Sequence, residues 1–375
     1  MNEVRIDRIE WAPLNGRRAR EARGNAYTRS HGQDFLMPIA RVTTSDGLMA
    51  FGWSRIDRQK ADSLVGFSFQ DAFHPQRGVS TDYLALDMPL WDLAGKLADR
   101  PVYELLSGET NTTALRAPCY DTSLLMDDLD LEDDDEAASL IASEAVKCAT
   151  RGHRSFKIKI GRGAMHMPVE EGLRRDIRVI KAVREALGAE ARILIDANNG
   201  YNLNLAKRML TETADADIYW IEEPFHESWQ WNGPFKKWLQ QQGLDVLVAD
   251  GEGVASEQLL TMAENGFIDV VQYDIFGFTD WVVLGPKLDA INIRTAPHNY
   301  AGLYGNCAAC HLAGGIRRFE MVEWDEASAT GLDASVYSIA DGHVNVPRLP
   351  GFGLQLDPDV FQQAVRDRGF TVSNT

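Results

Sequence analysis

The chain has 375 residues, 45% of them hydrophobic and 25% charged, with a formal net charge of −17. This charge argues against nucleic acids and anionic membranes as partners, and four scattered cysteines are too few for a disulfide framework. No apolar run reaches membrane-spanning length and the N-terminus lacks the apolar core of a signal peptide, so we expect a cytoplasmic protein.

The length of the chain favours one large and one small domain. Alternating apolar residues predict strands at 4–11, 37–43 and 48–55, and helical spacing follows within 80–107. Strands followed by helices predict a small α+β domain over residues 1–114.

An arginine-rich stretch, residues 14–32, joins the first two predicted strands. It contains Arg17, Arg18, Arg20, Arg23 and Arg29. One interpretation is a solvated surface loop. The other is a flap that gathers anions, because arginine binds carboxylates through two hydrogen bonds.

Strands and helices then alternate regularly. The predicted strands are 115–122, 154–160, 192–196, 218–222, 246–250, 268–274, 291–296 and 319–323. One helix between each pair predicts a barrel over residues 115–326. The tail, 327–375, is turn-rich with one helix near 358–368, and we expect it to pack back on the N-terminal domain. We assign the acidic run 127–136 no chemistry, and we expect the thiols of Cys307 and Cys310 to be buried in a helix.

Polar side chains end the predicted barrel strands in order. In Phe156-Lys157-Ile158-Lys159-Ile160 the two lysines share one face of a strand. Alone, this pattern would favour an edge strand with lysines in water. The following strands end in Asp196, Glu222, Glu252, Asp274, His298 and Glu323. Because the carboxyl ends of parallel barrel strands meet at one mouth, these residues predict an active site there.

The carboxylates of Asp196, Glu222 and Glu252 end three consecutive strands and would repel each other if they converged. A divalent cation removes this conflict, and oxygen-only ligands with open positions suit Mg²⁺. We therefore expect one Mg²⁺ ion per active site.

The remaining residues suggest acid–base chemistry on a bound carboxylate. Lys157 and Lys159 should favour each other's neutral form, and Asp274 should orient and charge His298. Lys159 and His298 would then approach an α-carbon from opposite faces. Glu323, if protonated, would donate a hydrogen bond to the oxygen that gains charge. We prefer Glu323 to Glu320 because it lies at the strand's end.

A family resemblance covers nearly the whole chain. It rests on Lys157-x-Lys159, Asp196-Ala-Asn198, Ile221-Glu222-Glu223-Pro224, Gly251-Glu252, Asp274, His298 and Glu323-Trp324. This ordered set resembles the mandelate racemase subgroup of the enolase superfamily. The chain departs from the muconate-lactonising and dipeptide-epimerase branches, which carry a lysine where it has the Asp-His pair.

The resemblance implies an N-terminal capping domain on a (β/α)7β barrel. It also implies Mg²⁺ on Asp196, Glu222 and Glu252, with Lys159 and His298 as acid and base. Asp274 would be the partner of His298. Substrate would contact Lys157, Asn198 and Glu323.

The expected function is an acid-sugar dehydratase, which abstracts an α-proton and eliminates the β-hydroxyl to give a 2-keto-3-deoxy acid. A racemase or epimerase using the same two bases is the alternative, and a catalytically idle sugar-acid-binding protein is a third. We predict a small-molecule carboxylate as partner, with the chain as a homo-oligomer. If the arginine-rich stretch closes over the mouth, dicarboxylic sugar acids would be preferred. Their distal end would then meet Arg17, Arg18, Arg20 or Arg23.

Overall fold

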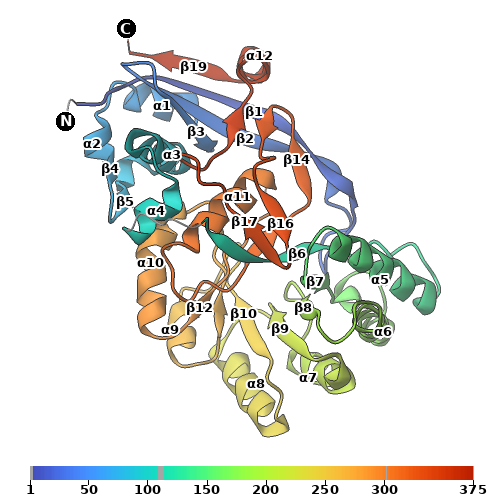
Figure 1. The fold of residues 1–375 in the computed structure, drawn as a ribbon. Coiled ribbons are helices and arrows are strands. Elements are labelled where there is room, and N and C mark those ends of the chain that lie inside the picture. Colours follow the sequence, from blue (N-terminus) through green and yellow to red (C-terminus); the bar gives the residue numbers. More distant parts are fainter. Residues whose placement is uncertain (1–2, 109–113, 301, 375) are drawn as a thin grey trace.

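A computed structural model describes residues 3–108, 114–300 and 302–374. Its N-terminal part is an antiparallel sheet of β1 (Ile6–Ala22), β2 (Gly32–Thr44) and β3 (Met49–Trp53). Two strands from the C-terminal tail, β14 (Ala327–Ala329) and β19 (Phe370–Ser373), pair with β1. Figure 1 shows the red β19 lying beside the blue β1. The prediction that the tail completes the capping sheet is confirmed.

The arginine-rich stretch differs from the predicted loop. Strand β1 continues to Ala22 and pairs with β2 down to the Ala22–Gly32 register, so only the tip of the hairpin is irregular. Side chains alternate between the faces of a strand, and here Arg18, Arg20 and Ala22 are less exposed than Arg17 and Glu21. The hairpin therefore turns one set of arginines towards the barrel and the other towards solvent.

Short helices pack under this sheet. They are α1 (Arg58–Leu64), α2 (Phe69–Ala72), η1 (Thr81–Leu86), α3 (Asp87–Ala98) and α4 (Val102–Ser107), with the two-residue strands β4 (Phe73–His74) and β5 (Gly78–Val79). Asp92 of α3 accepts hydrogen bonds from the backbone N–H groups of Phe51 and Phe352, both at 3.1 Å. One buried carboxylate thus joins the sheet to the tail.

Eight parallel strands form the second part of the molecule. They are β6 (Arg116–Leu124), β7 (Ser155–Lys159), β8 (Arg192–Asp196), β9 (Ile218–Glu222), β10 (Leu247–Asp250), β11 (Val270–Val271), β12 (Arg294–Thr295) and β13 (Val322–Trp324). Each pairs with the next from β6 to β12, and β13 pairs with β6. A parallel bridge between Thr295 and Phe319 links β12 to the approach of β13. The barrel is closed, as predicted.

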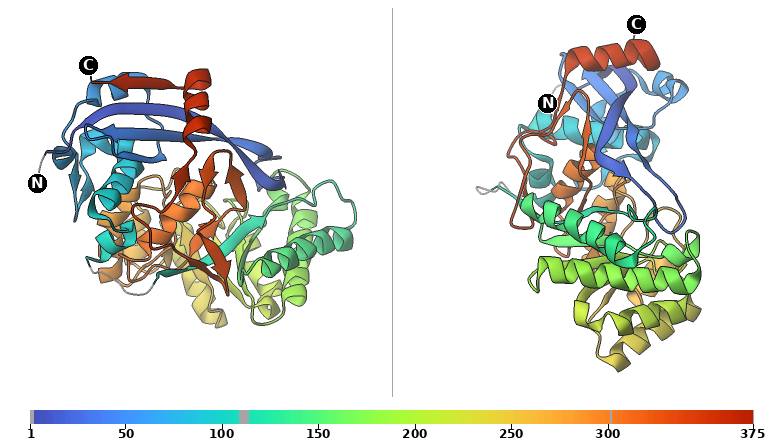
Figure 2. Two further views of the ribbon diagram at one scale, coloured as in Figure 1. Left: turned by 45° about the horizontal axis from the view of Figure 1, so that its top comes forward. Right: turned by 90° about the vertical axis from the view of Figure 1, so that its right-hand side faces the viewer.

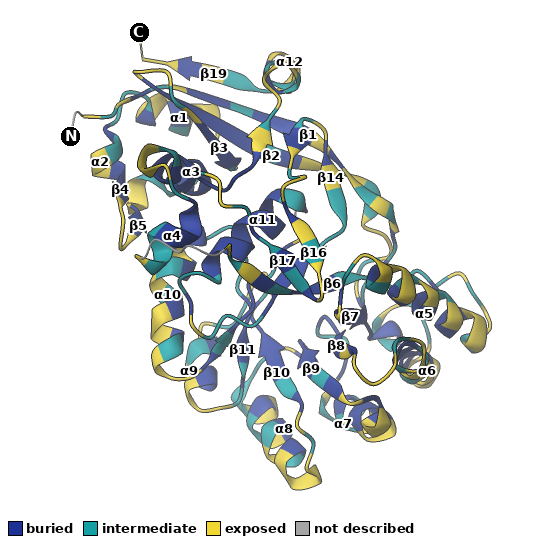
Figure 3. Cartoon of the chain, viewed as in Figure 1, coloured by how far each residue is buried: buried dark blue, intermediate teal, exposed yellow. Residues whose placement is uncertain are grey.

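Seven helices alternate with these strands and cover the barrel. They are α5 (Asp134–Thr150), α6 (Val169–Leu187), α7 (Leu203–Glu212), α8 (Trp229–Gln242), α9 (Leu259–Glu264), α10 (Phe278–Ala290) and α11 (Leu303–Leu312). The outer faces of α5 to α10 carry exposed residues, whereas α11 is almost wholly buried, and the strands inside are largely buried (Figure 3). Asp133 and Asn202 cap α5 and α7 by accepting backbone N–H bonds. The predicted (β/α)7β order is confirmed.

The remaining elements are short connections and the tail. They are η2 (Arg162–Ala164), η3 (Ala214–Ala216), β15 (Leu332–Asp333), β16 (Ser338–Ala340), β17 (His343–Asn345), β18 (Gln355–Leu356) and α12 (Pro358–Arg368). Strand β17 pairs with the start of β6, and α12 lies across the capping sheet beside β1 (Figure 2). The predicted division of the chain at residues 114 and 326 stays a prediction.

All four cysteines are buried and unpaired, as expected for Cys307 and Cys310. Among the described residues, no helix combines the length and apolar character needed to cross a membrane. The acidic run is largely paired with arginines: Asp127 with Arg20, Asp128 with Arg162, and Asp134 with Arg174 and Arg175. These pairs fix the segment between β6 and α5.

Candidate active site

The floor of the site is an apolar layer inside the barrel. It consists of Tyr120, Leu194, Trp220, Ala249, Val270, Ala296 and Met321. The ammonium of Lys157 lies 5.3 Å from the centre of the Tyr120 ring, directly next to this layer. Every residue of β7 is buried, so the period-two pattern that could have marked an edge strand instead places both lysines inside the barrel.

Three carboxylates meet where β8, β9 and β10 end. One oxygen each from Asp196, Glu222 and Glu252 lies within 4.8 Å of the other two. Asp196 and Glu222 are 0% and 1% exposed. Two buried carboxylates beside a third need compensating positive charge, and the all-oxygen donor set is the one that Mg²⁺ prefers. The residues present therefore fit the expected metal.

Both lysines contact this group. Lys157 Nζ lies 2.7 Å from Glu222 Oε1 and 3.4 Å from Asp196 Oδ2, while Lys159 Nζ is paired with Asp196. Burial would lower the pKa of each lysine, but the carboxylates outweigh it and raise both above the usual value. The expectation that the two lysines favour each other's neutral form beside Mg²⁺ stays a prediction.

Two amide side chains hold the carboxylates in place. Asn198 donates its side-chain N–H to Glu252 at 2.9 Å, and its side-chain oxygen accepts from Lys159 at 3.0 Å. Gln272 donates to Glu222 Oε2 at 3.0 Å. Sequence reasoning missed Gln272, although it lies two residues before Asp274 and therefore on the same face of an extended segment.

The carboxyl group of Glu222 is itself perturbed by its surroundings. Burial and the neighbouring Asp196 raise the pKa of Glu222 to about 8.

His298 lies between two carboxylates on the other side of the mouth. Its Nδ1 is 2.6 Å from Asp274 Oδ1 and its Nε2 is 3.0 Å from Glu252 Oε2. Burial opposes the charged form, but the carboxylates, led by Glu252, raise the pKa of His298 to about 9. The imidazole is thus oriented by Asp274 and held in its protonated form.

Glu323 faces into the barrel and Glu320 does not. Glu323 lies 2.7 Å from Lys157 and accepts from Thr122 at 2.6 Å, whereas Glu320 pairs with Arg294 at 3.1 Å. Despite burial, Lys157 lowers the pKa of Glu323 to about 2. Glu323 here accepts from Thr122 and from the backbone N–H of Asn299. Its role as a hydrogen-bond donor to the substrate stays a prediction.

A cavity of about 270 Å³ opens above these groups. Lys159, Glu252, His298 and Glu323 line its inner end. The remaining lining residues include Arg18, Arg20, Asn25, His31, Tyr300 and Asp325. The capping hairpin and the barrel therefore build one site together.

The four predicted distal arginines divide into two groups. Arg18 and Arg20 line the cavity, but Arg17 and Arg23 do not. Arg20 is held by Asp127 at 2.7 Å, and Arg18 lies 3.9 Å from Asp325. Arg17 is bonded to Gln33 at the surface and Arg23 is paired with Asp130. Arg17 points away from the cavity because side chains alternate along the strand, and Arg23 is drawn to Asp130 of the acidic run.

The chain is similar in sequence and structure to known proteins. Residues 140–360 match the family described as enolase C-terminal domain-like. A mandelate racemase/muconate lactonizing protein from Geobacillus sp. Y412MC10, complexed with magnesium and tartrate, is 41% identical. The match covers 100% of this chain and 98% of that one, with a TM-score of 0.97. The chain belongs to the mandelate racemase and muconate-lactonising subgroup of the enolase superfamily.

Other proteins to which the chain is similar are named for reactions of sugar acids. Galacturonate dehydratase from Geobacillus sp., solved with D-galacturonate and 5-keto-4-deoxy-D-galacturonate, is 41% identical with a TM-score of 0.95 over 99% of both chains. D-xylonate dehydratase from Haloferax volcanii is 26% identical across 74% of this chain and 68% of its own length. D-galactarolactone cycloisomerase from Agrobacterium fabrum is 29% identical across 77% and 75%.

The Asp274–His298 pair gives a first testable expectation. Asp274→Asn should lower kcat by about 10²-fold or more, because the imidazole loses the carboxylate that fixes its orientation and charge. KM should change much less, since Asp274 is behind the imidazole. Steady-state kinetics with Mg²⁺ measures both, and Asp82→Asn on the exposed surface is the matched control. An unchanged kcat in Asp274→Asn would show that the contact between Asp274 and His298 is not needed for catalysis.

Proposed function

We propose that the chain dehydrates a hexuronate, with D-galacturonate as the first candidate. The enzyme is a Mg²⁺-dependent acid-sugar dehydratase, a hydro-lyase of the enolase superfamily. The observation that carries the finer proposal is the charge balance at the outer end of the cavity. There Arg18 faces Asp325, and Arg20 is already paired with Asp127.

Each group at the inner end has a role in this reaction. Mg²⁺, when bound to Asp196, Glu222 and Glu252, supplies positive charge that stabilises the enediolate form of the substrate carboxylate. Lys159, in its neutral form, removes the proton from the carbon next to that carboxylate; Mg²⁺ on Asp196 would favour this neutral form, because it offsets the carboxylate charge that raises the pKa of Lys159. Breaking this C–H bond leaves an electron pair that expels the neighbouring hydroxyl as the C–O bond breaks.

His298 completes the elimination from the other side of the mouth. Its raised pKa keeps it protonated at neutral pH, so it can give a proton to the leaving hydroxyl, which departs as water. The resulting enol becomes a 2-keto-3-deoxy acid. In the numbering of a hexuronate this product is a 5-keto-4-deoxy acid. Lys157 and Asn198 would contact the substrate beside the reacting carbon.

The outer end of the cavity favours a substrate with only one carboxylate. The side chain of Asp325 is 13% exposed, and its partial burial raises its pKa to about 6, so it is mostly ionised at neutral pH. A second substrate carboxylate would face this group with only Arg18 left to offset it. A neutral hydroxyl can accept from Arg18 and donate to Asp325, and a ring oxygen can accept from Arg18. This balance supports uronates over the dicarboxylic preference that the arginine count suggested.

A substrate panel tests the proposal. The purified protein with Mg²⁺ is assayed for 2-keto acid formation from D-galacturonate, D-glucuronate, galactarate and D-galactonate. We expect kcat/KM for one of the two uronates to exceed that for galactarate by at least about tenfold, or ~1.4 kcal/mol. A preference for galactarate would restore the dicarboxylic alternative. Deuterium incorporation at the α-carbon without loss of water would support the racemase or epimerase alternative.

A further inference from the structure

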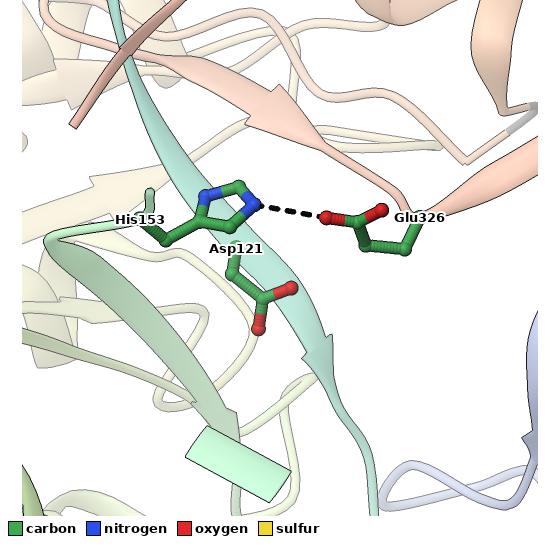
Figure 4. Close-up of side chains that lie close together, drawn as sticks. All are labelled: Asp121, His153 and Glu326. Atoms are coloured by element: carbon green, nitrogen blue, oxygen red, sulfur yellow. Dashed lines mark hydrogen bonds and ion pairs between the residues drawn. The ribbon is translucent and has the colours of Figure 1, made fainter. Parts of the chain in front are cut away.

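A second group of metal-ligand side chains lies outside the magnesium site and shares no residue with it. One nitrogen of His153 and one oxygen each of Asp121 and Glu326 lie within 4.8 Å of one another. Figure 4 shows the His153 ring facing Glu326, with Asp121 beside it. Asp121 comes from β6, His153 from the turn before β7, and Glu326 from the segment after β13.

The Asp121 side chain lies on the outside of the barrel wall. Asp121 follows Tyr120, which belongs to the inner layer, and precedes Thr122, which contacts the inward-facing Glu323. Alternation along β6 therefore turns Asp121 away from the barrel interior. The group spans the place where the last strand pairs with the first.

Two buried polar atoms in this group have no partner. Asp121 and His153 are both 0% exposed, and Asp121 Oδ2 and His153 Nδ1 each lack a hydrogen bond. The other oxygen of Asp121 accepts from Ser123 at 2.8 Å. Besides this hydroxyl, Asp121 has the Cys148 thiol as a neutral hydrogen-bonding neighbour, and Arg20 attracts it without bonding to it. A buried carboxylate with only these contacts is costly, because burial removes the water that would stabilise its charge. This cost indicates that a further positive group belongs beside Asp121.

We propose that Asp121, His153 and Glu326 form a second cation site that takes a first-row dication of the Zn²⁺ type. Zn²⁺ binds both imidazole nitrogen and carboxylate oxygen, whereas Mg²⁺ prefers oxygen ligands alone. The cation would neutralise Asp121, whose pairing is incomplete. It would also link β6, β7 and β13 where the barrel closes.

A cation at this site would compete with Arg151 for the carboxylate of Glu326. Glu326 Oε1 lies 3.1 Å from both His153 Nε2 and Arg151 Nε. The side chain of Arg151 is 39% exposed, so it can turn into solvent when a dication takes its place. The guanidinium therefore lowers the affinity for the cation, but it does not block the site.

The site would also steady the substrate cavity from outside. Glu326 lines the cavity, and its backbone oxygen accepts from the N–H of Ala19 on the capping hairpin at 3.0 Å. A cation on Glu326 would thus fix the hairpin that carries Arg18 and Arg20. Its role is structural, and it takes no part in moving protons.

Cobalt is the probe, because Co²⁺ takes Zn²⁺ ligands and absorbs visible light. Full-length protein is stripped with a chelator, saturated with Mg²⁺ and titrated with Co²⁺, with absorbance and total bound metal as readouts. We expect about one Co²⁺ per chain that excess Mg²⁺ does not displace. The same ion should bind to Glu222→Gln, in which the magnesium site is damaged.

Variants of the proposed ligands decide the assignment. His153→Gln should weaken Co²⁺ binding at least about tenfold and leave Mg²⁺ binding unchanged, while His74→Gln on the surface should behave as wild type. If circular dichroism shows that His153→Gln is unfolded, the partly exposed Glu326→Gln replaces it with the same expectation. Absence of Mg²⁺-resistant Co²⁺ binding, or equal Co²⁺ affinity in wild type and in the folded ligand variant, would overturn the proposal.

Discussion

Replacing Lys159 with alanine is expected to lower kcat by about 10²–10⁴-fold, the usual contribution of a general base. The reason is its position. Lys159 lines the inner end of the cavity, and Asp196 and Asn198 hold its side-chain nitrogen there. Alanine leaves the α-carbon without a proton acceptor on that side of the mouth. Steady-state kinetics on the best substrate of the panel measures the loss.

Exchange of the α-proton with solvent gives an independent readout for Lys159. Lys159→Ala should also stop deuterium uptake into remaining substrate if wild type shows it, because exchange needs the same proton transfer. Lys237→Ala, an exposed lysine on α8, should keep wild-type turnover. Wild-type kcat in Lys159→Ala would remove this residue from the mechanism and move the search for the base to His298.

The barrel could be predicted from the sequence because parallel strands bury both faces and end at one mouth. Asp196 and Glu222 close apolar runs that coincide with β8 and β9. The late strands were less predictable. Regular pairing is confined to residues 270–271 in β11 and 294–295 in β12, where the predictions extended over 268–274 and 291–296. Apolar runs do not reveal where a strand's hydrogen-bond ladder stops.

The position of each charged side chain in the fold could be predicted more easily than the charged groups that would surround it. Glu323 was placed correctly in the barrel, but its ionisation depends on Lys157 at 2.7 Å, a contact between strands far apart in sequence. The partners of Arg20 and Arg23 lie more than one hundred residues away, in the acidic run. Such pairings form only when segments that are distant in the sequence come together in the fold. The periodicity of residues within one segment carries no information about these contacts.

The same limit applies to the group of Asp121, His153 and Glu326. These residues are far apart in the chain and have no metal-binding spacing, so sequence patterns gave no signal for them. They meet because β13 pairs with β6 and β6 pairs with β7. Closure of the barrel alone brings the first and last strands together. The group was therefore found only from the structure.

Glu222→Gln is expected to weaken Mg²⁺ binding by at least about 10–100-fold and to lower kcat by about 10²–10³-fold, the usual cost of losing one group that stabilises developing negative charge. The buried carboxylate of Glu222 lies between Lys157 and Gln272. A glutamine keeps its size but removes the charge that attracts the dication. Isothermal titration with Mg²⁺ measures the affinity, and steady-state kinetics measures the rate.

Glu320→Gln is the matched control, because Glu320 lies in the same barrel but pairs with Arg294 away from the magnesium site. It should bind Mg²⁺ as wild type does. Chelation of wild-type protein should abolish turnover, and added Mg²⁺ should restore it in wild type and in Glu320→Gln. Wild-type Mg²⁺ affinity in Glu222→Gln would show that this carboxylate is not a ligand. Full turnover after chelation would be more serious, because the enediolate would then have to be stabilised by Lys157 and the other side chains alone.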